Sequence, residues 1–486
     1  MPYIYKAEQK VLQLDKDILQ KYFKNNFKKS TKAKGDYSNS LKPFTKHSMG
    51  EILESCLFQL LRNNGCLPSS SRSGEQKQNE STCNELTDML KRATSEIRSI
   101  LARYLQSQNI SFLLGNGCSM YAGSKSINNS ADKEGLIDSA IDELKQILPD
   151  NAGAWETFKD KKIEEVLNNL AHTRKYYEIL KSSKEKDTSA NDTLKKLDDL
   201  ILKFKTEFLK QYVFTIDYNS NEFHKLFLKK VIARDTNKSK VNIFTLNYDL
   251  LIEKTAEELG ILVNNGFMGF TVRKFDPMVY NIDYHVKVPE SNRPIPLNKS
   301  INLFKLHGSI SWFESEGALP YKVIEKQPRF EKGDNGAMFI KLENDEERPD
   351  YVIYPTYSKV RQSFDTPYSE LFRQFANILN LRNSTLFVIG YSFSDEHVNN
   401  IIGNALSNPN FNLVVFSYDD IINDNRSKFF NNLVERSKTD SRITLFAGPL
   451  LGSFEIISSY LLPYVEVEEN EKELDELAKV RDDNEC

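Results

Sequence analysis

Short, continuous runs of hydrophobic residues recur from residue 110 onward, and each run ends at a polar or glycine-containing turn. The runs cover residues 110–114, 241–246, 301–306, 385–389 and 411–416. Runs of this length are typical of buried strands. The segments between them have apolar residues three and four positions apart, which is the helical period. The alternation of the two patterns predicts an α/β fold with a parallel sheet and crossover helices.

The helical period is most extended between the first two predicted strands. Residues 136–148, 163–180 and 193–208 each show it. We therefore expect a helical module inserted at about residues 124–240.

Two further helical patterns precede the first strand, at residues 49–61 and 86–105. Residues 69–82, between them, contain no apolar side chain, which is typical of a flexible linker. These boundaries predict three parts. Residues 1–82 form a mainly helical N-terminal appendage with its linker, residues 83–450 form the main domain, and residues 451–486 form a C-terminal helix with an acidic tail.

The composition narrows the class of protein. With 40% hydrophobic and 27% charged residues and a mean hydropathy of -0.51, the 486-residue chain resembles ordinary soluble globular proteins. Its longest apolar run is far shorter than the roughly 18 residues of a spanning helix, and its charged N-terminus lacks an apolar signal segment. We therefore expect a cytoplasmic protein without a membrane segment.

The charge is nearly balanced overall but not at the two ends. A net charge of -3 gives no reason to expect nucleic-acid binding. Residues 1–48 carry eleven lysines against four acids, and residues 464–486 carry ten acids against three bases. The ends thus have net charges of +7 and -7, which are typical of solvated termini; contact within an oligomer or with a partner is the alternative.

The five cysteines contain no C-x-x-C pair, so neither a disulfide framework nor a thiolate zinc site is predicted.

Polar residues and glycines follow the first strand, at the edge where open parallel sheets bind ligands. Gly115, Asn116, Gly117 and Ser119 lie where this strand is expected to enter a helix. Their backbone N–H groups and the helix dipole could hold a pyrophosphate. A tight glycine turn is the alternative, and Cys118 within it is interpreted as a buried turn residue.

The second and third strands also lead into candidate chemistry. Asn247 and Asp249, in TLNYD, can hydrogen-bond ribose hydroxyls or hold a water; capping of the next helix is the alternative. His307, in KLHGS, can accept a proton at about pH 7, although a single histidine here can also be a satisfied polar residue.

The fourth strand leads into GYSFSDEHVNNII. Gly390 and Ser392 lie directly after it, and Asp395 is expected to cap the following helix. Asp419 lies after the fifth strand.

Taken in order, GNGCS, TLNYD, KLHGS and IGYSFSDEHVNNII closely resemble the bacterial sirtuin-like (Sir2-like) domain found in antiphage-defence NADases. Tyr354–Lys359 (YPTYSK) and Pro367–Phe375 (PYSELFRQF) add to the resemblance, which extends over roughly residues 110–448. It implies a Rossmann-like domain with a helical small module, so that residues 83–450 would be a sirtuin-like NADase domain.

The resemblance also implies that NAD+ binds as the substrate across the strand ends and that its nicotinamide–ribose bond is cleaved. Residues matched to pyrophosphate contacts are Gly115, Asn116, Gly117 and Ser119. Residues matched to adenosine contacts are Gly390, Ser392 and, more loosely, Asp419.

The same resemblance implies catalytic roles for three residues. Asn247 would position the ribose or the attacking water, and Asp249 would hold Asn247 or the ribose hydroxyls. His307 matches the catalytic histidine of the family and would accept a proton.

The chain departs from the protein-deacetylating sirtuins in two respects. Those proteins bind zinc through two C-x-x-C pairs, which this chain lacks, so no structural zinc is expected. GNG replaces the usual G-A-G, and TLNYD replaces T-Q-N-x-D, as in defence-type relatives that hydrolyse NAD without an acyl-lysine substrate.

The resemblance therefore implies an NAD+ glycohydrolase that depletes NAD in antiphage defence by abortive infection, under control of a partner or effector. No G-x-x-x-x-G-K-[ST] motif occurs, so ATPase activity would come from a separate chain such as a HerA-type ATPase. A homo-oligomer is also expected. The alternatives are a non-catalytic module that senses NAD or ADP-ribose, and a protein deacylase.

Overall fold

The computed structural model describes residues 95–125, 130–159, 161, 163–183, 188–235, 238–286, 295–297, 299–315, 323–333, 336–341, 352, 366–418 and 427–463. Several predicted features lie outside these residues: the helix at 49–61, the linker at 69–82, the charged ends at 1–48 and 464–486, the motif Tyr354–Lys359, and Asp419.

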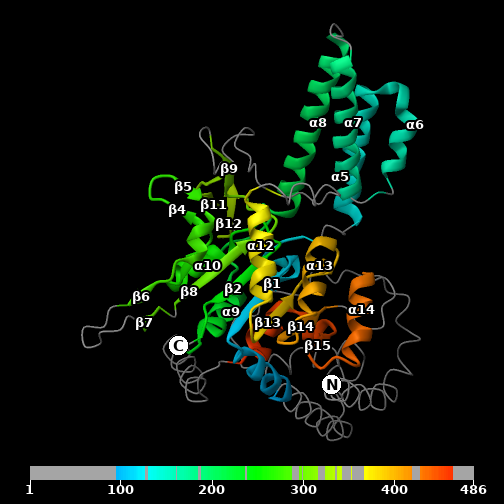
Figure 1. Cartoon of the computed structure of the whole chain (residues 1–486). Helices are drawn as coiled ribbons and strands as arrows, with labels where there is room; N and C mark the ends of the chain where they lie inside the picture. The colour runs from blue at the N-terminus through cyan, green and yellow to red at the C-terminus, as the bar shows by residue number, and fades with distance from the viewer. Residues whose placement is uncertain are drawn as a thin grey trace, which may run out of the picture.

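Seven parallel strands form the central sheet, in the order β15-β14-β13-β1-β2-β8-β3 (Figure 1). In chain order they are β1 (Asn109–Leu114), β2 (Val241–Thr245), β3 (Leu262–Asn264), β8 (Ser300–Lys305), β13 (Ser384–Ile389), β14 (Phe411–Ser417) and β15 (Ile443–Ala447). The five predicted strands are confirmed. The apolar pattern does not predict β3, which has three residues, or β15, in which Thr444 interrupts the run.

Aromatic side chains fix the register between neighbouring strands. Phe112 of β1 pairs with Phe387 of β13, and the ring centroids are 4.9 Å apart. Phe244 of β2 pairs in the same way with Phe304 of β8, at 4.6 Å. A shift of one residue would turn every such ring to the opposite face of the sheet. The strands that carry the predicted site are therefore held in one register.

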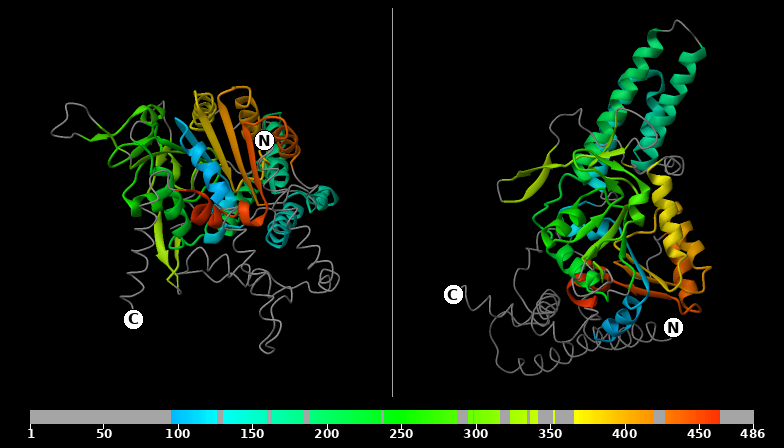
Figure 2. Two further views of the ribbon diagram at one scale, coloured as in Figure 1. Left: turned by 90° about the horizontal axis from the view of Figure 1, so that it is seen from below. Right: turned by 60° about the vertical axis from the view of Figure 1, so that its left-hand side comes forward.

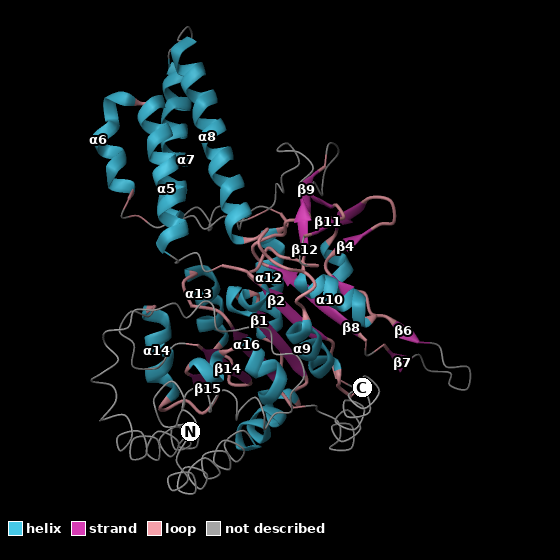
Figure 3. Ribbon diagram, turned by 180° about the vertical axis from the view of Figure 1, so that it is seen from behind, coloured by secondary structure: helices cyan, strands magenta, loops and turns pink. Residues whose placement is uncertain are grey.

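Helices cover both faces of the sheet, so its strands are buried on both sides (Figures 1 and 3). One face packs against α12 (Tyr368–Leu379), α13 (Glu396–Ala405) and α14 (Lys428–Ser437). The other packs against α9 (Glu222–Ile232), α10 (Leu251–Leu259), α16 (Phe454–Ile456), the π-helix η6 (Ile457–Leu461) and a helix over residues 95–105. This three-layer arrangement confirms the Rossmann-like α/β fold.

A helical bundle projects from one end of the sheet (Figures 1 and 2). It consists of α5 (Ser130–Ile147), α6 (Ala152–Trp155), α7 (Ile163–Ser183) and α8 (Thr188–Tyr212), which share an apolar core. Helix α9 also lies within residues 124–240, but it packs against α10 and η6. The bundle itself therefore comprises residues 130–212.

The remaining elements are short. A four-stranded antiparallel sheet contains β4 (Phe267–Met268), β5 (Arg273–Phe275), β9 (Trp312–Glu314) and β10 (Val323–Glu325). Two strand pairs are β6 (His285–Val286) with β7 (Ile295–Pro296), and β11 (Arg329–Lys332) with β12 (Met338–Lys341). Single turns of helix are η3 (Pro149–Asn151), η4 (Glu156–Phe158), η5 (Pro277–Asn281) and α15 (Pro449–Gly452). None of the described helices combines the length and the apolar character needed to cross a membrane.

Candidate functional site

The loops after β1, β2, β8 and β13 meet at the carboxyl edge of the sheet. Strand β1 lies between β13 and β2 in the sheet. Strands β2 and β8 follow on one side of β1, and strands β13, β14 and β15 follow on its other side, so the strand order reverses at β1. Such a reversal of strand order opens a ligand crevice in parallel sheets. The predicted site residues that the structure describes all lie in these four loops.

The loop after β1 differs from the prediction. Two short 3-10 helices, η1 (Asn116–Cys118) and η2 (Met120–Ala122), follow the strand in place of an α-helix. The N–H groups of Gly115 and Gly117 donate to the carbonyls of Ile389 and Gly390, at 2.9 and 3.0 Å. These two amides therefore hold the loop against β13, and a single 3-10 turn adds little of the dipole that the prediction assumed.

Three glycines allow the loops after β1 and β13 to touch. A Cβ on Gly115 would lie 2.4 Å from the carbonyl oxygen of Gly390, and one on Gly117 would lie 2.7 Å from the Gly390 Cα. Gly390 has a φ of +66°, in the left-handed region that favours glycine. Close contact between two backbones thus explains these glycines, and their pyrophosphate contacts remain a prediction.

Ser119 joins the loop after β1 to the loop after β2. Its buried hydroxyl donates to Asp249 Oδ2 at 2.8 Å and accepts from Asn247 Nδ2 at 3.0 Å. Asn247 Nδ2 also donates to the Gly115 carbonyl at 3.1 Å. Asp249 Oδ1 accepts from the N–H of Leu251 at 3.0 Å, as in an Asx turn at the start of α10. Both hydrogens of the Asn247 amide point into the protein, so the direction of its Oδ1 is fixed.

His307 pairs with a carboxylate from the far side of the site. Its Nε2 lies 3.1 Å from Asp395 Oδ2, and the two side chains are 8% and 6% exposed. Asp395 Oδ1 accepts from the N–H groups of His397 and Val398 at 2.9 and 3.3 Å, so Asp395 caps α13 as predicted. One carboxylate thus begins a helix with one oxygen and faces an imidazole with the other.

The loop that carries Asp395 is itself held by buried hydrogen bonds. The Tyr391 hydroxyl accepts from the Asp395 N–H at 3.1 Å and lies 3.0 Å from Asn399 Oδ1, to which it can donate. Asn399 Nδ2 donates to the Phe393 carbonyl at 2.9 Å. Burial raises the pKa of Tyr391 well above its usual value, so the phenol keeps its proton and remains a donor.

Further contacts connect the four loops in a ring. The Tyr248 carbonyl accepts from the Ile310 N–H at 3.2 Å, which joins the loops after β2 and β8. The Tyr248 and His307 rings lie 6.5 Å apart between centroids. Each loop therefore contacts the next, and the His307–Asp395 pair closes the ring at β13. The structure brings Asn247, Asp249 and His307 together at one edge.

Asn116 and Ser392 lie apart from these contacts. Asn116 Nδ2 donates to the Lys125 carbonyl at 2.9 Å, and its Oδ1 accepts from Ser124. The Asn116 side chain therefore joins the start of the loop after β1 to residues 124–125. Ser392 is exposed, with its Oγ 3.2 Å from Ser394 Oγ. Asp419 lies outside the described residues.

Cys118 is packed rather than reactive. Its Sγ donates to the Ile389 carbonyl at 3.4 Å, and burial raises the pKa of the thiol well above its usual value. This agrees with its interpretation as a buried turn residue.

The sequence motifs miss three charged residues of this region: Asp395 as the partner of His307, and Lys305 and Glu253 beneath the ring. Lys305 is 2% exposed, and its Nζ donates to the Asp249 carbonyl and to the Glu253 carboxylate. A lysine at the end of an apolar run suggests a solvent-exposed strand end, so the pattern conceals its burial.

Within the described part of the chain, no three His, Cys, Asp or Glu side chains are grouped so that they could hold a metal ion.

Comparisons relate this region to known proteins. Residues 241–435, which include Asn247, Asp249, His307 and Gly390, match the model of the SIR2-like domain family. A comparison with curated proteins gives no match.

Among solved structures, a Sir2 homolog–NAD complex is 13% identical, covers 76% of this chain and 93% of its own chain, and has a TM-score of 0.36. A Sir2 mutant with a p53 peptide and NAD is 11% identical, covers 75% and 96%, and has a TM-score of 0.33. A sirtuin from a study of substrate affinity is 12% identical, covers 74% and 97%, and has a TM-score of 0.33.

Proposed function

We propose that this protein is an NAD+ glycohydrolase, which adds water to the nicotinamide-bearing ribose carbon of NAD+ and releases nicotinamide and ADP-ribose. The observation that carries the proposal is the ring of loops at one sheet edge. It holds the Ser119–Asn247–Asp249 cluster and the buried His307–Asp395 pair together. Of these residues, all but Ser119 lie in the region that is similar to the SIR2-like domain family.

The reaction suits these side chains. The leaving nicotinamide of NAD+ is cationic, so the transition state has oxocarbenium character on the ribose and needs orientation and charge stabilisation more than a strong acid. The carboxylates of Asp249 and Asp395 supply negative charge at this edge. Water provides the new bond to carbon, the carbon–nitrogen bond breaks, and one proton is released.

Asn247 acts through its amide oxygen. Its Nδ2 donates to Gly115 and Ser119, so Oδ1 is the part of the amide left to accept a hydrogen bond from a ribose hydroxyl or a water. Asp249 holds this arrangement through Ser119.

His307 accepts the proton. In its neutral form, Nε2–H donates to Asp395, which leaves Nδ1 as the acceptor nitrogen of the ring. Proton transfer by a positioned side chain typically contributes about 10² to 10⁴ in rate.

The biological setting that we propose is antiphage defence by abortive infection. The motif resemblance supports it, and uncontrolled loss of NAD would harm the host. Activity would therefore depend on an effector, on assembly into a homo-oligomer, or on a partner such as a HerA-type ATPase.

Release of nicotinamide from NAD+ tests the proposal, both with the purified chain and in bacteria that express it before and during phage infection. We expect Asn247→Ala and His307→Ala to abolish release while remaining folded. Asn408→Ala and His172→Ala are controls, since Asn408 precedes β14 at the opposite sheet edge and His172 is exposed on α7.

The alternatives give different results. NAD+ that binds but stays intact in every condition would overturn the proposal and support a sensing module. Release of acyl groups from lysine peptides in proportion to NAD+ consumed would indicate a deacylase.

A further inference from the structure

Lys305 is a buried cation that the proposed reaction does not use. It ends β8, opposite Thr245 of β2, and only 2% of its surface is exposed. Burying an ammonium group is strongly unfavourable unless the group is paired and hydrogen-bonded. A lysine in this buried position therefore needs nearby hydrogen-bond acceptors and a negative charge.

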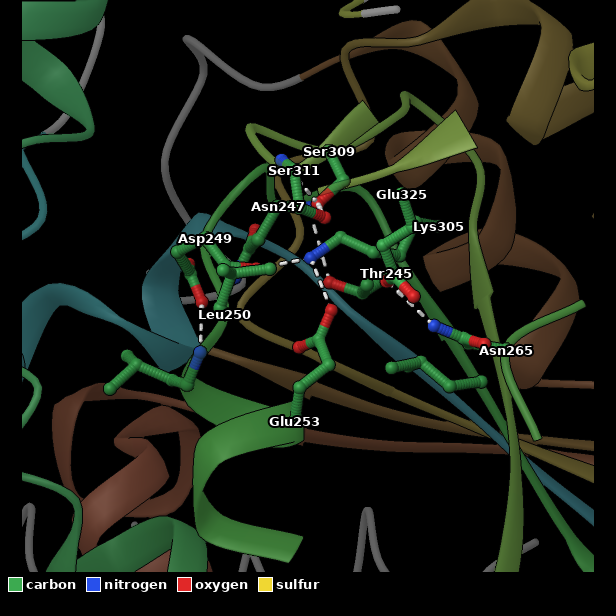
Figure 4. A network of polar contacts seen from close by, with 12 residues as sticks. Thr245, Asn247, Asp249, Leu250, Glu253, Asn265, Lys305, Ser309, Ser311 and Glu325 are labelled. Carbon is green, nitrogen blue, oxygen red and sulfur yellow. Dashed lines mark hydrogen bonds and ion pairs between the residues drawn. The ribbon is translucent and has the colours of Figure 1, made fainter. Parts of the chain in front are cut away.

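The Lys305 Nζ donates hydrogen bonds to two partners, as Figure 4 shows. Nζ donates to the backbone carbonyl of Asp249, in the loop after β2, and to Oε1 of Glu253 at 2.9 Å, in the first turn of α10. Burial raises the pKa of Glu253, and the Lys305 charge opposes that rise. The other oxygen of Glu253 has no hydrogen-bond partner among the described residues, so Lys305 is the main support of this carboxylate.

Through its contact with the Asp249 carbonyl, Lys305 holds the loop that carries the proposed catalytic residues Asn247 and Asp249. Asp249 is then fixed at three points: its carbonyl by Lys305, its Oδ1 by Leu251 N–H, and its Oδ2 by Ser119. Ser119 in turn holds the Asn247 amide. Loss of the Lys305 ammonium group would thus allow Asp249 to shift. Through Ser119, that shift would change the direction of the Asn247 amide oxygen.

We propose that Lys305 is a positioning residue, whose ammonium group clamps the Asp249 backbone against the Glu253 carboxylate and so sets the geometry of Asn247 and Asp249. This inference rests on the proposed NAD+ cleavage for its effect on rate. The contacts themselves do not depend on that function.

A double variant separates positioning from simple stability. Lys305→Met alone leaves Glu253 buried without its cation, and it can fail to fold. Replacing both members of a buried ion pair by apolar residues of similar size is often neutral or stabilising. We therefore expect Lys305→Met with Glu253→Leu to melt close to the parent chain.

Two measurements on this double variant then decide the role. If Lys305 positions the loop, kcat for NAD+ cleavage falls by about 10- to 100-fold, as expected for a misplaced catalytic group, with little change in KM. Hydrogen exchange also becomes faster in peptides that cover residues 247–251. Lys254→Met, which removes the Lys254–Glu258 pair on the same helix, should change neither quantity.

A stable double variant with parental kcat and parental exchange at residues 247–251 would overturn the inference. If the parent chain cleaves no NAD+ in any condition, purified or in infected cells, the proposed function fails, while exchange at residues 247–251 still reports whether Lys305 holds the loop. Parental exchange in that case would also overturn the positioning role.

Discussion

His307 and Asp395 are 88 residues apart in sequence, and their side chains meet at 3.1 Å across the ends of two other strands. Strands β8 and β13 are separated in the sheet by β2 and β1, and at about 4.8 Å per step their ends lie about 14 Å apart. The loops after β8 and β13 must therefore extend toward each other over the ends of β1 and β2. The pair closes the ring of loops around Ser119 and Asn247.

The first prediction separates the charge of Asp395 from its capping role. Asp395→Asn retains an oxygen that can cap α13, but its amide nitrogen would present hydrogens to His307 Nε2. The imidazole must then change tautomer or turn, as it does when asparagine replaces the aspartate of a catalytic triad. We expect kcat for NAD+ cleavage to fall by about 10² to 10⁴-fold, with little change in melting temperature.

Ser427→Ala is the matched control for the cap. Ser427 Oγ accepts from the Phe430 N–H at 3.2 Å and caps α14, outside the ring. Its loss should cost about 1 kcal/mol of stability and leave turnover unchanged. Asp395→Ala should combine both defects. Parental turnover in folded Asp395→Asn would show that the pair with His307 has no role in the reaction.

The second prediction concerns the buried hydroxyl of Ser119. Ser119→Ala removes the donor to Asp249 Oδ2 and one acceptor of the Asn247 amide. An unsatisfied buried carboxylate oxygen should lower the free energy of unfolding by about 1–3 kcal/mol. The freed Asn247 amide should reduce turnover by about tenfold or more. Urea unfolding and nicotinamide release measure the two effects.

Ser384→Ala provides the comparison for Ser119. Ser384 is also buried, and its Oγ donates to the Leu379 carbonyl at 2.8 Å, but it lies at the opposite end of β13. It should lose similar stability and keep its turnover. Equal turnover in the two variants would contradict a role for Ser119 in orienting Asn247.

The strands that carry the site could be predicted because parallel strands are buried on both faces. Burial on both sides makes each strand a continuous apolar run, as in TLFVI before Gly390, and such runs are visible without knowledge of the fold. The end of each run then places Asn247, His307 and Gly390 at one edge. Short β3 and the interrupted β15 lack this signal.

The pairs within the site could not be predicted in the same way. Which strand ends are neighbours depends on the strand order, and periodicity carries no information about that order. Asp395 was expected as a helix cap, and it is one; its second oxygen meets His307 only because two loops cross over the sheet edge. In place of the α-helix expected after β1, two 3-10 turns follow the strand, and in the first of them the N–H groups of Cys118 and Ser119 donate to the carbonyls of Gly115 and Asn116.

The third prediction tests the contact between the loops after β1 and β13. Gly390→Ala would place a Cβ 2.7 Å from the Cys118 nitrogen, at a φ of +66°. The left-handed conformation alone costs about 1–2 kcal/mol for a residue with a Cβ, and the close contact adds to this. We expect a loss of at least about 2 kcal/mol of stability, together with loss of NAD+ cleavage.

Gly135→Ala shows the contrast expected at an open position. Gly135 lies in α5, and a Cβ there would meet nothing within 4 Å. Alanine should stabilise the helix by about 0.5–1 kcal/mol and leave activity unchanged. Denaturant unfolding of both variants checks the difference, and a Gly390→Ala protein as stable as the parent would refute the close contact.

The fourth prediction concerns the pH dependence of stability through His224. This buried imidazole of α9 lies 2.7 Å from the Tyr121 hydroxyl and packs against Phe454 of the C-terminal segment. Burial lowers its pKa from 6.5 to about 4, and the charge of Asp249 opposes the shift only partly. In the tautomer with its hydrogen on Nε2, the neutral imidazole can accept the Tyr121 hydrogen at Nδ1, and protonation would remove that acceptor.

The sign follows from the two pKa values. Between pH 6.5 and about pH 4 the unfolded chain binds a proton that the folded chain does not, so stability is complete above pH 6.5 and is lost as the pH falls. This term should lower the free energy of unfolding by about 2 kcal/mol between about pH 7 and about pH 5. His224→Asn, which does not titrate, should lose this part of the pH dependence, whereas His172→Asn on the exposed face of α7 should retain it. Urea unfolding at the two pH values measures the difference, and equal pH slopes for the parent and His224→Asn would show that His224 is not the group responsible.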